Sequence, residues 1–191
     1  ILGSVSSSPL HMASVFATIA NSGQQCKPQS IESVTDRDEN VLKEFAADCK
    51  EVISPDVANK TAALLTASAG QYYTSTRLGD GRPFAAKSGT TDGHANTWLT
   101  GFTPSLATSA WVGHGDNSSQ EVSGVVINGV YHSEIFGETY VGQNIWAPYM
   151  TQALAGTPVE TVSNANIGAT TPQRGATPTP TPSASPTSND H

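Results

Sequence analysis

Three short runs of strand-forming residues follow one another between residues 84 and 112. They cover Phe84 to Thr90, Asn96 to Phe102 and Leu106 to Val112, and Gly, Pro, Asn and Ser residues separate them, which favours turns between strands. Helical patterns lie before and after these runs. The order of elements therefore predicts an α+β domain in which helices pack on an antiparallel sheet.

Two helices are predicted before the strands. The first is expected from Ser8 to Gly23, because Ser8 can cap it, Pro9 fits its first position and Gly23 fits just past its end. The second opens at Ser54-Pro55-Asp56 for the same reasons and is expected to stop at Gly70. The apolar residues of the first helix repeat with helical spacing, which predicts a buried face made of Leu10, Met12, Val15, Phe16 and Ile19.

A β-hairpin is predicted between the two helices, and a long loop and a last helix are predicted after the strands. The alternating runs Ile31 to Thr35 and Val41 to Phe45 flank a polar turn. The Gly-, Ser- and Asn-rich stretch 113–142 is expected to be a loop with one strand-like piece at Val125-Val126-Ile127. Residues 146–154 are expected to form the final helix.

The C-terminal part of the chain differs in composition from the rest. No aromatic residue follows residue 154, and five of the twelve prolines fall in the last twenty residues. Such a segment cannot bury enough apolar surface to fold. The sequence therefore predicts one domain, residues 1–158, and a disordered Pro/Thr/Ser-rich tail, residues 159–191. A content of only 37% hydrophobic and 13% charged residues agrees with an unpacked segment.

Charge and hydropathy exclude several classes of function. The formal net charge is −7 and no Lys/Arg cluster occurs, so neither a nucleic-acid surface nor an anionic-membrane surface is expected. No apolar run approaches the roughly 18 residues that span a bilayer. No metal or other cofactor is predicted, because metal-ligand spacing is lacking among His11, His94, His114, His132 and His191.

The stretch Lys87-Ser88-Gly89-Thr90-Thr91 contains the residues best suited to chemistry. Lys87 lies on an otherwise apolar strand, where burying a charge is costly without a partner. Gly89 has no side chain, so a ligand can approach the backbone, and the Ser88 and Thr90 hydroxyls flank it. This pattern is typical of a strand edge that binds a carboxylate and an adjacent carbonyl oxygen. An ordinary edge strand with a snorkelling lysine and a glycine bulge would also show it.

The wider context resembles a known family. Lys87-Ser88-Gly89 is similar to the Lys-Thr/Ser-Gly motif of the penicillin-binding proteins and serine β-lactamases. Three further stretches resemble class A bifunctional penicillin-binding proteins: Asn96-Thr97-Trp98-Leu99-Thr100-Gly101-Phe102-Thr103-Pro104, Ala110-Trp111-Val112-Gly113 and, upstream, Ser8-Pro9-Leu10-x-Met12-Ala13. The resemblance covers residues 1–155. It implies the C-terminal part of a transpeptidase domain with the serine β-lactamase/DD-peptidase-like fold.

This resemblance implies roles for the site residues. Lys87 would belong to the proton network around the nucleophile, and the Ser88 and Thr90 hydroxyls would bind the terminal carboxylate of a D-Ala-D-Ala stem peptide or of a β-lactam. The Thr90 backbone N–H would be one of two oxyanion-hole donors. Gly89 and Thr91 would complete the substrate-binding strand.

The resemblance also implies a longer parent protein. That parent would be a serine-type D-Ala-D-Ala transpeptidase/carboxypeptidase and, being class A, a peptidoglycan glycosyltransferase. It would act at the extracytoplasmic face of the bacterial membrane, anchored through an N-terminal part outside this sequence. Its partners would be peptidoglycan stem peptides and β-lactams, with this chain bound to the rest of the parent.

The sequence departs from the family at the nucleophile. The family uses a Ser-x-x-Lys and a helper Ser-x-Asn. No serine here stands three residues before a lysine, and no serine stands two residues before an asparagine. We therefore expect both motifs to lie upstream of Ile1. Two alternatives stay open, a serine β-lactamase-like hydrolase and a non-catalytic cell-wall binding module.

The two cysteines are predicted to form a disulfide. Facing residues in a regular antiparallel pairing have a constant sum of numbers, and a sum of about 76 would place Ile31 opposite Phe45. The sum for Cys26 and Cys49 is 26 + 49 = 75, so they would lie nearly opposite at the base of the hairpin. Their bond would stabilise the fold by roughly 3 kcal/mol in the chain-entropy model. Two unlinked thiols are the alternative.

The isolated chain should form no covalent adduct with a labelled penicillin, because it lacks the Ser-x-x-Lys pattern. Mass spectrometry of the intact chain after incubation measures this. A stoichiometric acyl adduct on any serine would show that the nucleophile lies within these residues.

Overall fold

The centre of the fold is a three-stranded antiparallel sheet. The computed structural model describes residues 5–117 and 119–162. The strands β5 (Ala85–Thr90), β6 (Asn96–Thr103) and β7 (Leu106–Gly113) lie in the order β5-β6-β7. Each agrees with its predicted run to within one residue. Within the described part of the chain, no further strand pairs with the outer edge of β5.

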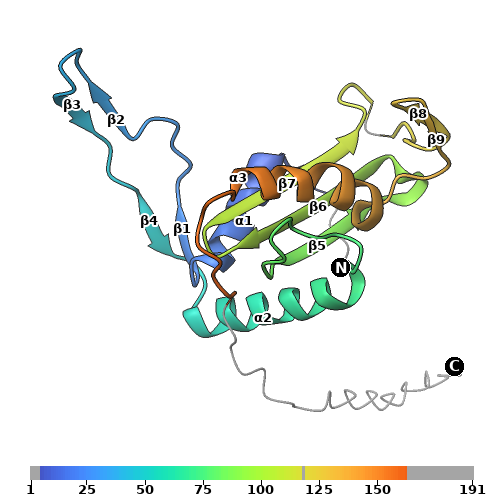
Figure 1. Ribbon diagram of the computed structural model, residues 1–191, viewed down its shortest axis with the longest axis horizontal. Coiled ribbons are helices and arrows are strands. Elements are labelled where there is room, and N and C mark those ends of the chain that lie inside the picture. Colours follow the sequence, from blue (N-terminus) through green and yellow to red (C-terminus); the bar gives the residue numbers. More distant parts are fainter. Residues whose placement is uncertain (1–4, 118, 163–191) are drawn as a thin grey trace, which may run out of the picture.

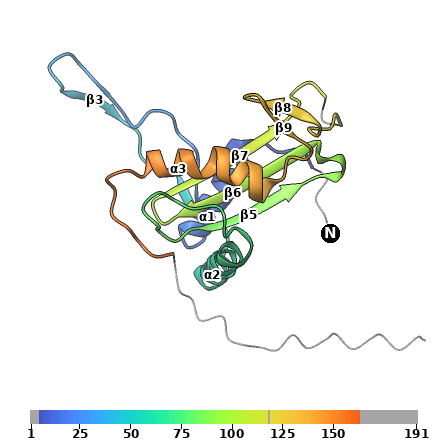
Figure 2. The same cartoon turned by 45° about the vertical axis from the view of Figure 1, so that its right-hand side comes forward.

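Helices cover both faces of this sheet (Figures 1 and 2). α1 (Pro9–Ala20) and α2 (Pro55–Tyr72) lie on one face. Helix η2 (Gly137–Trp146), a wide helix that α3 (Ala147–Ala153) continues, lies on the other face. The predicted α+β fold with an antiparallel sheet packed by helices is confirmed.

The start of α1 follows the predicted capping. The Ser8 side chain accepts a hydrogen bond from the His11 backbone N–H at 3.3 Å, and this satisfies one of the unpaired donors at the helix N-terminus. The expected buried face is only partly correct. Phe16 is buried, whereas Leu10 is 61% and Val15 is 46% exposed. Met12 and Ile19 are partly buried against the sheet.

The second helix is longer than predicted. α2 continues past Gly70 to Tyr72, because a glycine inside a helix costs only about 1 kcal/mol relative to alanine and does not by itself end it. Its inward face consists of small residues, Ala58, Ala62 and Ala69. After these two additional helical residues, the next residue, Tyr73, lies in the core beside β5.

The sheet has a hydrophobic core on each face. On the η2/α3 face, Trp146 is fully buried and its ring lies 5.1 Å from that of Phe84. Its indole N–H donates to the Thr108 carbonyl oxygen at 3.2 Å. On the α1/α2 face, Phe16 meets Phe102 edge-on with ring centroids 6.3 Å apart, a geometry that aromatic pairs prefer.

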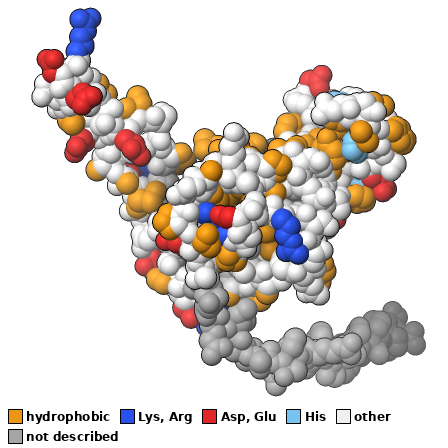
Figure 3. Space-filling view, viewed as in Figure 1, with side chains coloured by type: hydrophobic (Ala, Val, Ile, Leu, Met, Phe, Trp, Pro, Cys, Tyr) orange, Lys and Arg blue, Asp and Glu red, His pale blue; other side chains and the backbone are white. Residues whose placement is uncertain are grey.

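A long antiparallel arm projects from this body between α1 and α2 (Figure 1). Its base pairs β1 (Gln24–Cys26) with β4 (Cys49–Glu51), and its tip pairs β2 (Ser33–Thr35) with β3 (Val41–Glu44). Acidic side chains gather along the arm in Figure 3. The predicted hairpin therefore exists, with a second ladder at its base that was not predicted.

The register of the arm brings the two cysteines together. Cys26 pairs directly with Cys49, and a disulfide joins them. The expected pairing of Ile31 with Phe45 is wrong, because the Phe45 N–H donates to the Glu32 carbonyl oxygen at 2.9 Å. The difference arises at an irregularity between Val34 and Thr35, which shifts the numbering of facing residues.

The region predicted as one long loop contains more structure than expected. β8 (Val125–Ile127) matches the strand-like piece, but it pairs with β9 (Val130–His132) in a hairpin that was not predicted. Helix η2 begins at Gly137, well before the expected start of the last helix. A short helical turn, η1 (Asp92–His94), joins β5 to β6.

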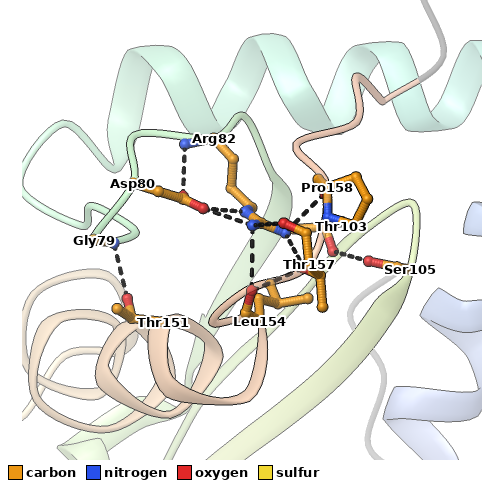
Figure 4. Close-up of polar contacts among 9 residues, drawn as sticks. All are labelled: Gly79, Asp80, Arg82, Thr103, Ser105, Thr151, Leu154, Thr157 and Pro158. Carbon is orange, nitrogen blue, oxygen red and sulfur yellow. Dashed lines mark hydrogen bonds and ion pairs between the residues drawn. The ribbon is translucent and has the colours of Figure 1, made fainter.

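Arg82 fastens the end of α3 to the start of β5 (Figure 4). Its buried guanidinium donates to the Asp80 carboxylate at 2.7 Å and to the Leu154 and Thr157 carbonyl oxygens at 3.3 and 3.0 Å. Beyond this clamp, Val162 is buried against the α1/α2 face. The predicted boundary at residues 158 and 159 stays a prediction, and tail residues 163–191 lie outside the described residues.

Denatured but unreduced protein from an oxidising compartment should show no free thiol, because both cysteines are bonded in the arm. Thiol titration before and after reduction measures this, and reduction should release two thiols per chain. Two thiols before reduction would contradict the bond.

Asp80→Asn should lower the melting temperature at neutral pH, and the loss should vanish in acid. The hydrogen bonds from Arg82 hold the pKa of the Asp80 carboxyl below its usual range. A carboxylate with a lowered folded-state pKa stabilises the fold above its unfolded pKa, about 3.9, and this contribution disappears as pH falls through the folded value.

Thermal unfolding of both proteins between neutral pH and strongly acid pH measures the effect. Asp116→Asn, which changes an exposed carboxylate in the loop after β7, is the matched control and should melt with the wild type throughout. A gap between wild type and Asp80→Asn that stays constant down to acid pH would contradict the assignment.

Candidate functional site

Lys87, Ser88, Gly89 and Thr90 of the predicted site lie on β5, whose outer edge pairs with no other strand of the described residues, and Thr91 follows the strand directly. In the β5–β6 pairing, Lys87 faces Thr100, Gly89 faces Trp98 and Thr90 faces Thr97. Because side chains alternate along a strand, Ser88 and Thr90 share the η2/α3 face, whereas Lys87 and Gly89 start on the opposite face. The motif therefore spreads over both sides of one edge.

Backbone hydrogen bonds show which amides point out from this edge. The Ser88 N–H donates to the Tyr73 hydroxyl at 2.8 Å, away from β6. The Thr91 N–H donates to the Asn96 carbonyl oxygen at 3.0 Å, toward the β6 side. Since amide direction alternates along an antiparallel strand, the Thr90 N–H points outward with that of Ser88. This is the position that an oxyanion-hole donor would need.

The Lys87 ammonium reaches the same edge. It donates to the Ser88 carbonyl oxygen at 2.8 Å, and the side chain is exposed. The prediction considered the cost of burying this charge, but the structure leaves it accessible to solvent. The ammonium therefore lies beside the outward backbone groups and is free to reorient toward a ligand.

The two hydroxyls of the motif each have a partner on the protein side. Tyr73 donates its phenol proton to Ser88 Oγ at 3.2 Å. The Gly137 N–H, at the start of η2, donates to Thr90 Oγ1 at 3.4 Å. The Tyr73 hydroxyl lies on the outer side of the β5 edge, where the Ser88 N–H points, although Tyr73 as a whole is only 4% exposed.

Gly89 and Thr91 complete the stretch in different ways. A Cβ atom at Gly89 would meet only the Cβ of Trp98, at an ordinary 3.8 Å, so packing among the described residues does not require a glycine there. Thr91 closes the turn into β6, where its hydroxyl accepts from the Asn96 N–H at 2.9 Å. Thr91 is thus part of the turn that positions the strand.

No group of metal ligands accompanies the motif. Across residues 5–117 and 119–162, no three His, Cys, Asp or Glu side chains gather as a metal site would require. His94 instead packs edge-on against Phe136, with ring centroids 4.6 Å apart, and His132 packs in the same way against Tyr140 at 4.8 Å.

Among residues 5–117 and 119–162, no helix has both the length and the hydrophobicity needed to cross a bilayer.

Tyr73 and Gly137 are the site neighbours that sequence reasoning missed. Tyr73 was placed beyond the expected end of the second helix, and Gly137 was placed inside a featureless loop. The glycine at position 137 could have been recognised as a site of close packing, because a Cβ atom there would overlap the Trp98 carbonyl oxygen and lie 3.0 Å from the Ser88 Cβ. Close backbone approach is a recurrent reason for a glycine.

An antiparallel sheet with helices on both faces, and a Lys-Ser-Gly-Thr strand at its outer edge, matches the strand that carries the Lys-Thr-Gly motif in penicillin-binding proteins and serine β-lactamases. The chain belongs to the penicillin-binding protein transpeptidase domain family, whose family model matches residues 2–130. The resemblance predicted from the motifs is therefore confirmed.

Relatives agree with this assignment. The chain is 35% identical over 190 residues to penicillin-binding protein 1A of Mycolicibacterium smegmatis, covering 94% of this chain and 23% of that protein. It is 34% identical over 170 residues to penicillin-binding protein 2D of Bacillus subtilis, covering 82% and 22%. The solved structure of penicillin-binding protein PonA1 from Mycobacterium tuberculosis superposes with a TM-score of 0.65 at 32% identity, covering 79% of this chain and 39% of that one. The chain thus spans about a quarter of the curated relatives it matches.

Proposed function

We propose that this chain supplies the substrate-binding strand of a peptidoglycan D,D-transpeptidase. The observation that supports the proposal is the outer edge of β5. There the outward amide of Thr90, the Lys87 ammonium and the hydroxyls of Ser88 and Thr90 lie along one strand. Such an edge offers donors both to a carboxylate and to a carbonyl oxygen that gains negative charge.

The proposed reaction divides the work between this chain and a serine outside it. A serine of a Ser-x-x-Lys motif attacks the carbonyl carbon of the penultimate D-Ala, and the terminal D-Ala leaves with its amine. The amine of a second stem peptide then attacks the acyl-enzyme and releases the serine. In both steps the Thr90 N–H stabilises the oxyanion, and Lys87 supports proton transfer at the serine.

The proposal extends to the longer protein in which the chain would act. Stem peptides and β-lactams are its proposed ligands, and both carry the carboxylate that the β5 edge would bind. We place the reaction at the extracytoplasmic face of the bacterial membrane, where a disulfide such as Cys26–Cys49 persists. The class A resemblance adds a carboxypeptidase side activity and a glycosyltransferase domain to the proposal.

Lys87→Ala in the longer protein should slow acylation by labelled penicillin at least about a hundredfold, the size expected when a group in proton transfer is lost. Thr90→Val should have a milder effect, because it removes the hydroxyl but keeps the backbone donor. Lys60→Ala is the matched control, since Lys60 lies on α2 in an exposed pair with Asp56.

The measurement is the second-order rate constant of acylation, taken from time courses of labelling with the penicillin. Equal rates for wild type and Lys87→Ala would refute the role of Lys87. A wild-type protein that binds cell-wall peptides but forms no acyl adduct would instead be the non-catalytic binding module. Rapid hydrolysis of the adduct would favour the β-lactamase-like alternative.

A further inference from the structure

Tyr73 occupies a position that no motif of the sequence indicates. It follows α2 directly, is buried in the core of the η2/α3 face, and yet its hydroxyl reaches the edge of β5. There it makes two hydrogen bonds to a single residue, Ser88. Because both hydrogen bonds of this buried phenol go to Ser88, Tyr73 can fix the orientation of the Ser88 hydroxyl.

The directions of these two bonds fix the direction of the Ser88 hydroxyl. A phenol has one proton. Tyr73 accepts from the Ser88 backbone N–H at 2.8 Å and donates its own proton to Ser88 Oγ at 3.2 Å. Ser88 Oγ is therefore an acceptor on the protein side, and its own proton is left to donate elsewhere.

The Thr90 hydroxyl also accepts a hydrogen bond from the protein. Its Oγ1 accepts from the Gly137 N–H at 3.4 Å, so its hydroxyl proton also remains available. Ser88 and Thr90 stand on the same face of β5, two residues apart. Both hydroxyls of the motif thus accept a hydrogen bond from the protein, and each keeps its own proton to donate.

We propose that Tyr73 is a positioning residue that makes the Ser88 hydroxyl a dedicated donor to an anionic carboxylate. An undirected hydroxyl serves donors and acceptors alike, whereas one that already accepts from Tyr73 favours a ligand with lone pairs and negative charge. Tyr73 therefore contributes to selectivity for carboxylate-bearing ligands over neutral ones. This inference rests on the proposed function of the β5 edge.

The test compares two probes in the longer protein, a labelled penicillin with its free carboxylate and the methyl ester of the same penicillin. Tyr73→Phe should slow acylation by the free acid about tenfold, the size expected when the hydrogen bond from Ser88 to the charged carboxylate is weakened. Acylation by the ester should change little, so the ratio of the two rates should fall. A purely structural role would slow both probes equally.

Two controls make the result specific. Tyr72→Phe removes the same hydroxyl from the adjacent residue, which is 66% exposed, and should behave as the wild type. In a double-mutant cycle, Tyr73→Phe should not change the acid-to-ester ratio further once Ser88→Ala is present, because the selectivity that Tyr73 provides acts through the Ser88 hydroxyl.

Each outcome decides between the proposals. An unchanged acid-to-ester ratio in Tyr73→Phe would overturn this inference, whereas failure of the wild type to acylate would overturn the proposed function itself. If Tyr73→Phe does not fold, Ser88→Ala still leaves the inference open to refutation, because it removes the hydroxyl through which Tyr73 would act. A wild-type ratio in Ser88→Ala would overturn the inference.

Discussion

The packing of Trp146 onto Gly101 is the contact on which the rest of the structure depends. A Cβ atom at Gly101 would lie 2.7 Å from Cζ2 of Trp146 and 2.7 Å from the Ala85 carbonyl oxygen. Only glycine lets the indole lie directly on the central strand, where it is fully buried. Because Trp146 ends η2, this contact fixes the helix along the sheet. The other end of η2, Gly137, is thereby brought against β5 and donates to Thr90.

A sheet that is covered on both faces leaves its free edge as the place where backbone groups remain open to a ligand. Thr97, Leu99 and Phe102 of β6 are almost fully buried, so these side chains of the central strand are closed to a ligand. The first two residues of β5 are buried, Ala85 in the core of the α1/α2 face and Ala86 in the core of the η2/α3 face. The motif residues that follow them are exposed or partly exposed. The strand is therefore rigid where it is buried and accessible where the motif lies, as an oxyanion donor requires.

The sequence predicted those parts of the fold that local patterns decide. The three central strands follow from alternating residues between strong turn residues, and the N-terminus of α1 follows from Ser8 and Pro9. Contacts between distant segments were missed, because β9 and η2 lie in a polar, Gly-rich stretch without a clear period. The motif residues could be located from the sequence, whereas their hydrogen-bond partners could not.

The link between Tyr73 and Ser88 shows why such partners escape sequence reasoning. Fifteen residues separate them, and their meeting depends on α2 continuing through Gly70 so that Ala69 and Tyr73 both enter the core. The Tyr73 ring is held there by packing, and its hydroxyl is held by Ser88. The orientation of a site hydroxyl is thus set by the same apolar contacts that stabilise the sheet. Protein cores are close-packed and transmit strain. Under the proposed function, a change in the core packing around Tyr73 would therefore also change how the β5 edge presents Ser88 to a ligand.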